Sequence, residues 1–181
     1  MTASATTIRR ATPADAGDVT AMVGEIAAHE DQAAHVHVDT DLWRRLLARP
    51  DVIVLLAECD GMAAGYVSAV RQLHLWTGGD VLNLDDLYVR PGHRDGGIGR
   101  RLMAALAALA TPDQLLIRWG VEVDNVDAQR FYRRLGATLR PKILAAWPPA
   151  VYSAPAADLR PHREPGGNAG SSPVPTSNDQ P

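Results

Sequence analysis

The chain has 181 residues, enough for one well-packed domain and too few for two ordinary ones. Hydrophobic residues make up 46 % of the sequence and charged residues 22 %, which is the balance of a soluble globular protein. The formal net charge of −3 argues against binding of nucleic acid or of an anionic membrane surface, because either partner favours a basic stripe on the protein.

Both ends of the chain are poor in apolar residues. Residues 1–7 lack the apolar core of a signal peptide and no window approaches the length of a membrane span, so we expect a cytoplasmic protein. Residues 153–181 are rich in Pro, Gly and Ser, with few apolar side chains to offset the cost of ordering. We therefore expect one folded domain at residues 5–152 and a disordered tail at residues 153–181.

Strand and helix signals alternate along the predicted domain. Thr12 followed by Pro13 is a typical helix start, and Asp60-Gly61 between two apolar runs is a strong hairpin signal. In chain order we expect a strand at 6–9, helices at 13–28 and 40–47, strands at 53–58 and 62–70, a loop at 72–80, a strand at 81–89, a helix at 98–110, a strand at 115–123, a helix at 128–135 that Gly136 ends, and weaker strand signals from 137 onward.

This order of elements predicts the α/β fold class. A mixed sheet with helices on both faces buries the apolar side of every element. The strand at 115–123 should run parallel to the strand at 81–89, because a right-handed crossover through the helix at 98–110 joins them.

A glycine-rich turn links the strand at 81–89 to the helix at 98–110. Successive glycines let backbone N–H groups point at one spot, and the helix N-terminus adds partial positive charge. Arg94 and Arg100 are close enough to add charge-assisted contacts, so the turn predicts a seat for a pyrophosphate. No Gly-Lys-Ser/Thr follows, which excludes a Walker-type phosphate loop, and the late position in the chain disfavours a dinucleotide-binding fingerprint. An ordinary glycine-rich loop is the remaining alternative.

Two motifs, separated by one predicted strand, carry a family resemblance. The first, Arg/Gln-x-x-Gly-x-Gly/Ala, is matched by Arg94, Gly97 and Gly99. The second, Asn-x-x-Ala-x-x-Phe-Tyr-x-x-x-Gly, is matched by Asn125, Ala128, Phe131, Tyr132 and Gly136. On these residues the chain resembles the GNAT family of N-acetyltransferases, over residues 6–140. The strand at 84–89 and the one that contains Trp119 look most like the diamine acetyltransferase branch.

The resemblance implies a fold, a reaction and a set of cofactor contacts. The implied fold is a mostly antiparallel mixed sheet that splays between two parallel central strands. The implied reaction moves an acetyl group from acetyl-CoA to a primary amine of a small molecule by direct attack. We expect no metal, no nucleic acid and no membrane as a partner. The protein is expected to form a homodimer. The implied acetyl-CoA contacts are Leu87, Tyr88, Val89, Arg94, Asp95, Gly96, Gly97, Ile98, Gly99, Arg100 and Asn125.

The resemblance also implies catalytic residues. Tyr132 falls where the family often has a general acid, although packing of its ring against the sheet is an alternative. Asp85 or Asp86 is the candidate base that deprotonates the amine through water, and period-two alternation should put one of them in the cleft. Asp85 matches the diamine acetyltransferase branch better.

Three acidic residues near the end of the first helix fall where the family builds its acceptor pocket. They are Glu25, Glu30 and Asp31, and a carboxylate-rich wall would favour a cationic amine. A solvated acidic face is the alternative.

Several features of the sequence depart from this pattern or stand outside it. Asp95 stands where the family often has Gly, and a carboxylate there repels a pyrophosphate unless it turns outward or pairs with Arg94. Cys59 is expected to be an inert core thiol. The spacing of the four histidines His29, His35, His37 and His74 fits no metal-ligand pattern, so we expect them at the surface or in the pocket. Two other functions remain open: acetylation of a protein or peptide, and a sensor that binds acyl-CoA without turnover.

Overall fold

The computed structural model describes residues 6–153 of the chain. Contacts divide the chain into a unit that ends at Leu139 and a second that begins at Arg140. The strands of the first unit are β1 (Thr6–Arg10), β2 (Val52–Cys59), β3 (Met62–His74), β4 (Gly79–Val89) and β5 (Leu116–Arg118). Its α-helices are α1 (Ala16–His29), α2 (Thr40–Leu47), α3 (Ile98–Ala110) and α4 (Val126–Arg134), with 3-10 turns at Pro13–Asp15, Ala33–His35 and Pro91–His93. The described part of the second unit contains the short helix α5 (Pro149–Tyr152).

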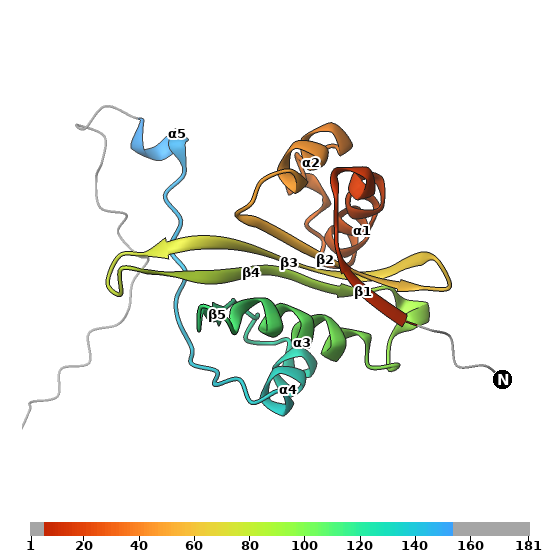
Figure 1. Ribbon diagram of the computed structural model, residues 1–181. Helices are drawn as coiled ribbons and strands as arrows, with labels where there is room; N and C mark the ends of the chain where they lie inside the picture. Colours follow the sequence, from red (N-terminus) through yellow and green to blue (C-terminus); the bar gives the residue numbers. More distant parts are fainter. Residues whose placement is uncertain (1–5, 154–181) are drawn as a thin grey trace, which may run out of the picture. The chain divides into compact units, whose positions relative to one another are not determined.

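The first unit is a five-stranded sheet in the order β1-β2-β3-β4-β5, covered on both faces. Strands β1 to β4 are antiparallel to their neighbours, whereas β5 runs parallel to β4. Helices α1 and α2 lie on one face of the sheet, and α3 and α4 lie on the other (Figure 1). This arrangement confirms the predicted fold class, with the difference that β5 is the edge strand of the described sheet.

Alternating side chains of the strands supply two separate cores. On β2, Val54 and Leu56 are buried with α1 and α2, while Ile53 and Leu55 are buried with α3. The fully buried anchors of α1 are Val19 and Met22, and those of α3 are Leu102 and Leu106. Each face of the sheet therefore packs against its own pair of helices through a separate hydrophobic core.

Helix α4 ends as its glycine predicts. Gly136 has φ 89°, and its N–H donates to the Arg133 carbonyl at 3.0 Å. The N–H of Ala137 donates to the Tyr132 carbonyl at 3.1 Å, which completes a Schellman motif. This motif fixes the end of the helix that carries Tyr132.

The strands β3 and β4 form a longer hairpin than the sequence predicts. The loop expected at 72–80 is wrong, because β3 continues to His74 and β4 begins at Gly79. Polar cross-strand pairs extend the ladder: Arg71 donates to Asp80 at 2.7 Å, and Asn83 donates to Gln72 at 2.7 Å. Apolar patterning does not register such pairs.

The chain after α3 has less strand than predicted. The strand expected at 115–123 is limited to the three residues of β5, and none of the described residues from 137 to 153 forms the strands that weaker signals suggested. Pro141, Pro148 and Pro149 cannot donate to a ladder and interrupt this stretch. Residues 154–181, where the disordered tail was predicted, lie outside the described residues. Within residues 6–153, no helix combines the length and the apolar character that crossing a membrane requires.

Candidate active site

A β-bulge on β4 interrupts the alternation of its side chains. Val67 on β3 pairs with Leu87, whereas Ala69 pairs with Leu84, so two β4 residues oppose Ser68. These two residues are Asp85 and Asp86. The bulge puts Leu84 and Leu87, three positions apart, on the same α3 face. Simple alternation therefore does not decide which aspartate faces the cleft.

Strands β4 and β5 separate soon after they meet. They pair only at Val81–Leu116, Leu82–Ile117 and Asn83–Arg118 among the described residues. Past Asn83, the side of β4 that faces β5 has no strand partner in the part of the chain that the structure describes. A cleft of about 890 Å³ is lined by this free end of β4 together with residues of α1, α3 and α4. The predicted site residues that line it are Glu30, Leu87, Tyr88, Val89, Arg94, Asp95, Gly97, Ile98, Gly99, Arg100, Asn125 and Tyr132.

The N-terminus of α3 opens into this cleft without a capping side chain. Its N-cap residue is Gly97, with φ 78°, and no side chain of the described residues accepts a hydrogen bond from the first turn. In contrast, Asp39 caps α2 and Asn125 caps α4 through side-chain oxygens. Within residues 6–153 the first amides of α3 therefore lack an acceptor, which is the arrangement of an anion-binding helix end.

Arg94 is anchored to the end of β4. Its Nε donates to the Val89 carbonyl at 2.9 Å, and its guanidinium lies 6.0 Å from the centre of the Tyr88 ring. Asp95 follows with φ 65°, a left-handed conformation in which glycine avoids the strain of a side chain. Among the described residues, no ion pair joins Asp95 to Arg94. Gly96, also expected at the cofactor, is not among the residues that line the cleft.

Tyr132 projects from α4 into the cleft. Its ring contacts Trp119 at 4.8 Å and Phe131 at 5.2 Å between centroids, and 8 % of the residue is exposed. Its hydroxyl makes no hydrogen bond to any residue within 6–153. Burial, and then the negative charge of Asp86, raise the pKa of Tyr132. The phenol therefore keeps its proton at neutral pH and has no partner that competes for it.

The two aspartates of the bulge have different surroundings. The Tyr66 hydroxyl donates to the Asp86 carboxylate at 2.9 Å, and the Asp86 N–H donates to the Ser68 hydroxyl at 3.1 Å. Burial and this carboxylate hold the pKa of Tyr66 far above its usual range. Asp85 is an exposed residue. Its carboxyl is nevertheless partly shielded from water, and this desolvation, together with the smaller effect of the negative charge of Asp86, raises the pKa of Asp85. Asp86 is thus fixed in place by Tyr66 and Ser68, whereas no such hydrogen bond holds the Asp85 carboxylate within residues 6–153. Neither lines the cleft.

Only one of the three acidic residues predicted for the acceptor pocket lines the cleft. Glu30 lines the cleft, with His29 and Ile26 beside it on the same helix. Asp31, with φ 55°, and Glu25 are not among the lining residues. The Glu25 carboxylate instead accepts hydrogen bonds from Arg90 and Tyr88.

Two basic side chains in the cleft, His93 and Arg134, were not predicted as site residues. His29, which was expected at the surface or in the pocket, also lines the cleft. Arg134 lies inside the second family motif, at a position that the motif leaves free, so its sequence context gave no signal. His93 follows Pro91 and Gly92 in the 3-10 turn that ends β4, a loop position without periodicity.

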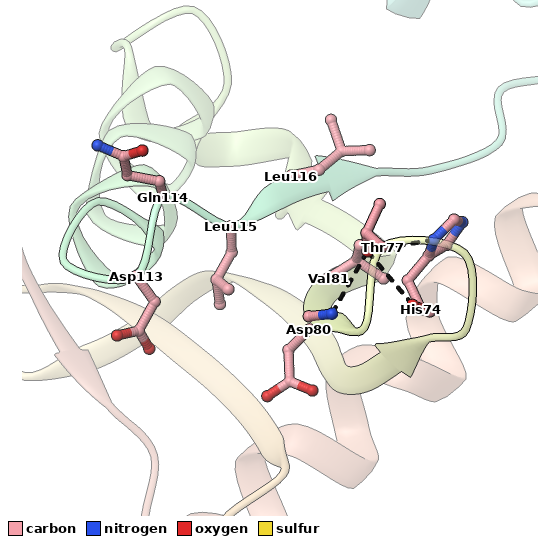
Figure 2. Close-up of a pocket in the computed structure, with 9 residues that line it drawn as sticks. His74, Thr77, Asp80, Val81, Asp113, Gln114, Leu115 and Leu116 are labelled. Carbon is pink, nitrogen blue, oxygen red and sulfur yellow. Dashed lines mark hydrogen bonds between the residues drawn. The ribbon is translucent and has the colours of Figure 1, made fainter.

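A second, smaller cavity lies at the other end of β4. Its volume is about 300 Å³, and the β3–β4 turn and the segment that enters β5 line it (Figure 2). The carboxylates of Asp80 and Asp113 at its wall both pair with Arg71, at 2.7 and 2.8 Å. None of the predicted site residues lines this cavity, so the candidate chemistry belongs to the larger cleft.

Comparison with known proteins places these features in a family. The model of the acetyltransferase (GNAT) family matches residues 21–137. A mouse thialysine N-epsilon-acetyltransferase is 29 % identical over 147 residues, which cover 74 % of this chain and 85 % of the relative. The structure of a putative acetyltransferase from Arthrobacter sp. FB24 is 32 % identical, covers 82 % of this chain and 99 % of that one, and superposes with a TM-score of 0.67. An aminoglycoside N-acetyltransferase in complex with CoA shares the fold at a TM-score of 0.68, with 17 % identity over 81 % of this chain and 97 % of that one.

Proposed function

The chain belongs to the GNAT family and is an acetyl-CoA-dependent N-acetyltransferase, and we propose that it acetylates a primary amine of a small molecule. The observation that carries the proposal is a single cleft. It joins the uncapped end of α3, the unpaired end of β4, the free Tyr132 hydroxyl and the acidic end of α1. These are the groups that binding of a thioester cofactor, stabilisation of charge and proton transfer require.

The pyrophosphate of acetyl-CoA fits the N-terminus of α3. The amides of Ile98, Gly99 and Arg100 open into the cleft and need acceptors, which an anionic oxygen supplies. The Arg100 side chain adds positive charge at the same place. Acetyl-CoA supplies the acetyl group as a thioester.

The free end of β4 is suited to hold the arm of the cofactor. Within residues 6–153, the backbone groups of residues 84–89 on the side of β5 have no strand partner, so apart from the Val89 carbonyl, which accepts from Arg94, they can bond to the pantetheine. The N–H of Val89 or a neighbour is our candidate to stabilise the negative oxygen that develops on the thioester carbonyl. Leu87 and Val89 give this arm an apolar lining.

Proton transfers fall to an aspartate and a tyrosine. A primary ammonium has a pKa of about 10, so it must lose a proton before it attacks. Asp85, with its raised pKa, takes this proton through water, and Asp86 stays fixed by Tyr66. Tyr132 then gives a proton to the departing thiolate, which its unpaired hydroxyl allows. The amine attacks directly while both substrates occupy the cleft.

A small cationic acceptor matches the α1 side of the cleft. Glu30 places a carboxylate at this wall, and Asp31 follows it in the chain. The mouse relative is named for a small amine substrate, thialysine, which favours a small molecule over a protein.

The test is release of coenzyme A thiol from acetyl-CoA against a panel of polyamines, amino acids, aminoglycosides and basic peptides. We expect turnover with at least one small primary amine. Turnover with peptides alone would contradict the small-molecule acceptor. Binding of acetyl-CoA by calorimetry with no turnover on any amine would favour the sensor alternative instead.

A further inference from the structure

An ion pair joins α1 to the residue that follows β4. Arg90 Nε lies 3.1 and 3.0 Å from the two carboxylate oxygens of Glu25, and Arg90 Nη2 lies 2.7 Å from Oε1. The Tyr88 hydroxyl donates to Glu25 Oε2 at 3.1 Å. Both oxygens of the carboxylate are therefore engaged, and hydrogen bonds from Arg90 are the main cause of the lowered pKa of Glu25.

Two main-chain carbonyls of β3 also bind Arg90. Its N–H donates to the Ala64 carbonyl at 2.9 Å, and its Nη1 donates to the Ala63 carbonyl at 2.6 Å. Arg90 is thus tied to β3 and follows directly on β4. It forms a rigid point to which α1 can be attached.

Glu25 lies in the half of α1 that leads to the cleft. The fully buried anchors Val19 and Met22 belong to the earlier turns of the helix, and Ala27 is the one buried residue after them. Ile26, His29 and Glu30, which line the cleft, all follow Glu25. Val23 and Ile26 pack only partly buried against the same core, so the apolar contacts of α1 decrease towards its last turn, and the Glu25–Arg90 pair adds a polar contact there.

The same pair reaches the cofactor side of the cleft through Tyr88. Tyr88 lines the cleft, bonds to Glu25 through its hydroxyl, and carries the Arg94 guanidinium over its ring. One carboxylate thus links the wall assigned to the acceptor with the strand assigned to the thioester.

We propose that Glu25 and Arg90 are positioning residues: their ion pair holds the last turn of α1, with His29 and Glu30, at a set distance from β4, and so sets how the amine approaches the thioester. This inference rests on the proposed function. It assigns Glu25 a role through Arg90 in place of the direct contact with the amine that its position in the sequence suggested.

A double-mutant cycle separates the two roles of Glu25. If the pair positions α1, Glu25→Gln and Arg90→Gln should each raise KM for the amine about tenfold, and the double variant should resemble either single one. The Kd for acetyl-CoA should stay within about twofold, because the α3 seat is untouched. Arg90→Lys keeps the charge without the bidentate contact and should fall in between. The exposed pair Asp41–Arg44 on α2 provides a matched control cycle, in which KM should not change.

Hydrogen exchange gives a readout that does not depend on turnover. Amides of residues 23–30 should exchange about tenfold faster in either single variant than in the wild type, with no change in α3. Unchanged exchange of residues 23–30 would overturn the inference. An increase of KM in the double variant that equals the product of the two single increases would also overturn it. A lower KM in Arg90→Gln would also overturn it, since a freed Glu25 would then be binding the amine. If the wild type acetylates no amine, the proposed function fails, and exchange still decides whether the pair holds α1.

Discussion

Replacing Asp95 with Asn tests the position of the pyrophosphate seat. The substitution removes one negative charge from the cleft, and Asn accepts the left-handed conformation, φ 65°, as readily as Asp does. Within the described part of the chain no cation pairs with this carboxylate, because Arg94 donates to Val89 instead. Its repulsion of a bound anion is therefore uncompensated.

The expected gain follows from the charges. Two unit charges about 7 Å apart in water interact by about 0.6 kcal/mol. A pyrophosphate carries about two charges, so removal of the carboxylate should favour binding by about 1.2 kcal/mol, an approximately eightfold lower Kd for acetyl-CoA. At 1 M salt, where the Debye length is about 3 Å, the gain should fall below about twofold.

Titration calorimetry with acetyl-CoA at low and high salt measures this difference. Asp41→Asn on α2 is the control, since it makes the same charge change at an exposed residue that does not line the cleft. Asp95→Gly should bind as tightly as Asp95→Asn and also raise the free energy of unfolding by about 1 kcal/mol, because glycine relieves the left-handed strain. An Asp95→Asn variant that binds no tighter than the wild type at low salt would refute a pyrophosphate beside residue 95.

Three further predictions address the acid, the fold's response to pH and the packing behind β4. Tyr132→Phe should lower kcat by about a hundredfold with an unchanged Kd for acetyl-CoA, and a kcat within about threefold of the wild type would remove Tyr132 as the acid. Hydrogen bonds from Arg9 hold the pKa of Asp15 well below its usual range, so its contribution to stability should be complete above about pH 4 and be lost as the pH falls further. Denaturant unfolding of Asp15→Asn against the wild type should accordingly show a difference at pH 6 that narrows towards pH 2. Gly65→Ala would place a Cβ 2.5 Å from the Tyr88 carbonyl oxygen, so it should destabilise the protein and lower kcat, whereas Gly17→Ala in α1, with no atom within 4 Å, should stabilise it by up to about 1 kcal/mol in thermal or denaturant unfolding.

Local signals account for the parts of the fold that the sequence predicted well. The helix at 98–110 has the predicted bounds, because its apolar stripe lies within the segment and Gly97 directly precedes it. Asp60 and Gly61 both adopt positive φ, 52° and 79°, as a two-residue hairpin turn requires. The predicted length of β5 was wrong because it depends on a contact distant in the sequence. Residues 119–123 have the composition of a strand, but β5 extends only as far as β4 stays paired with it.

The candidate site was predictable where its residues belong to the two motifs. Twelve of the predicted residues line one cleft, including Arg94 and Gly97 from the first motif and Asn125 and Tyr132 from the second. The Glu25–Arg90 pair was not predictable, because 65 residues separate its members and each by itself looks like a solvated charge. Long-range ion pairs leave no mark on local periodicity.

The bulge on β4 is the clearest case in which the structure changes the chemistry assigned to a pattern. Strict alternation would put Asp86 on the same face as Leu84, pointing at α3. One extra residue opposite Ser68 instead lets Asp86 reach Tyr66, on the face that α1 covers, while Leu87 and Val89 return to the cleft side. Because β5 has already separated from β4 at this point, the bulge and the gap together leave a short stretch of strand with apolar side chains, free backbone groups and an adjacent carboxylate. A regular, fully paired strand offers no such combination, so the irregularity that local patterning misses is the feature on which the proposed acetyl transfer depends.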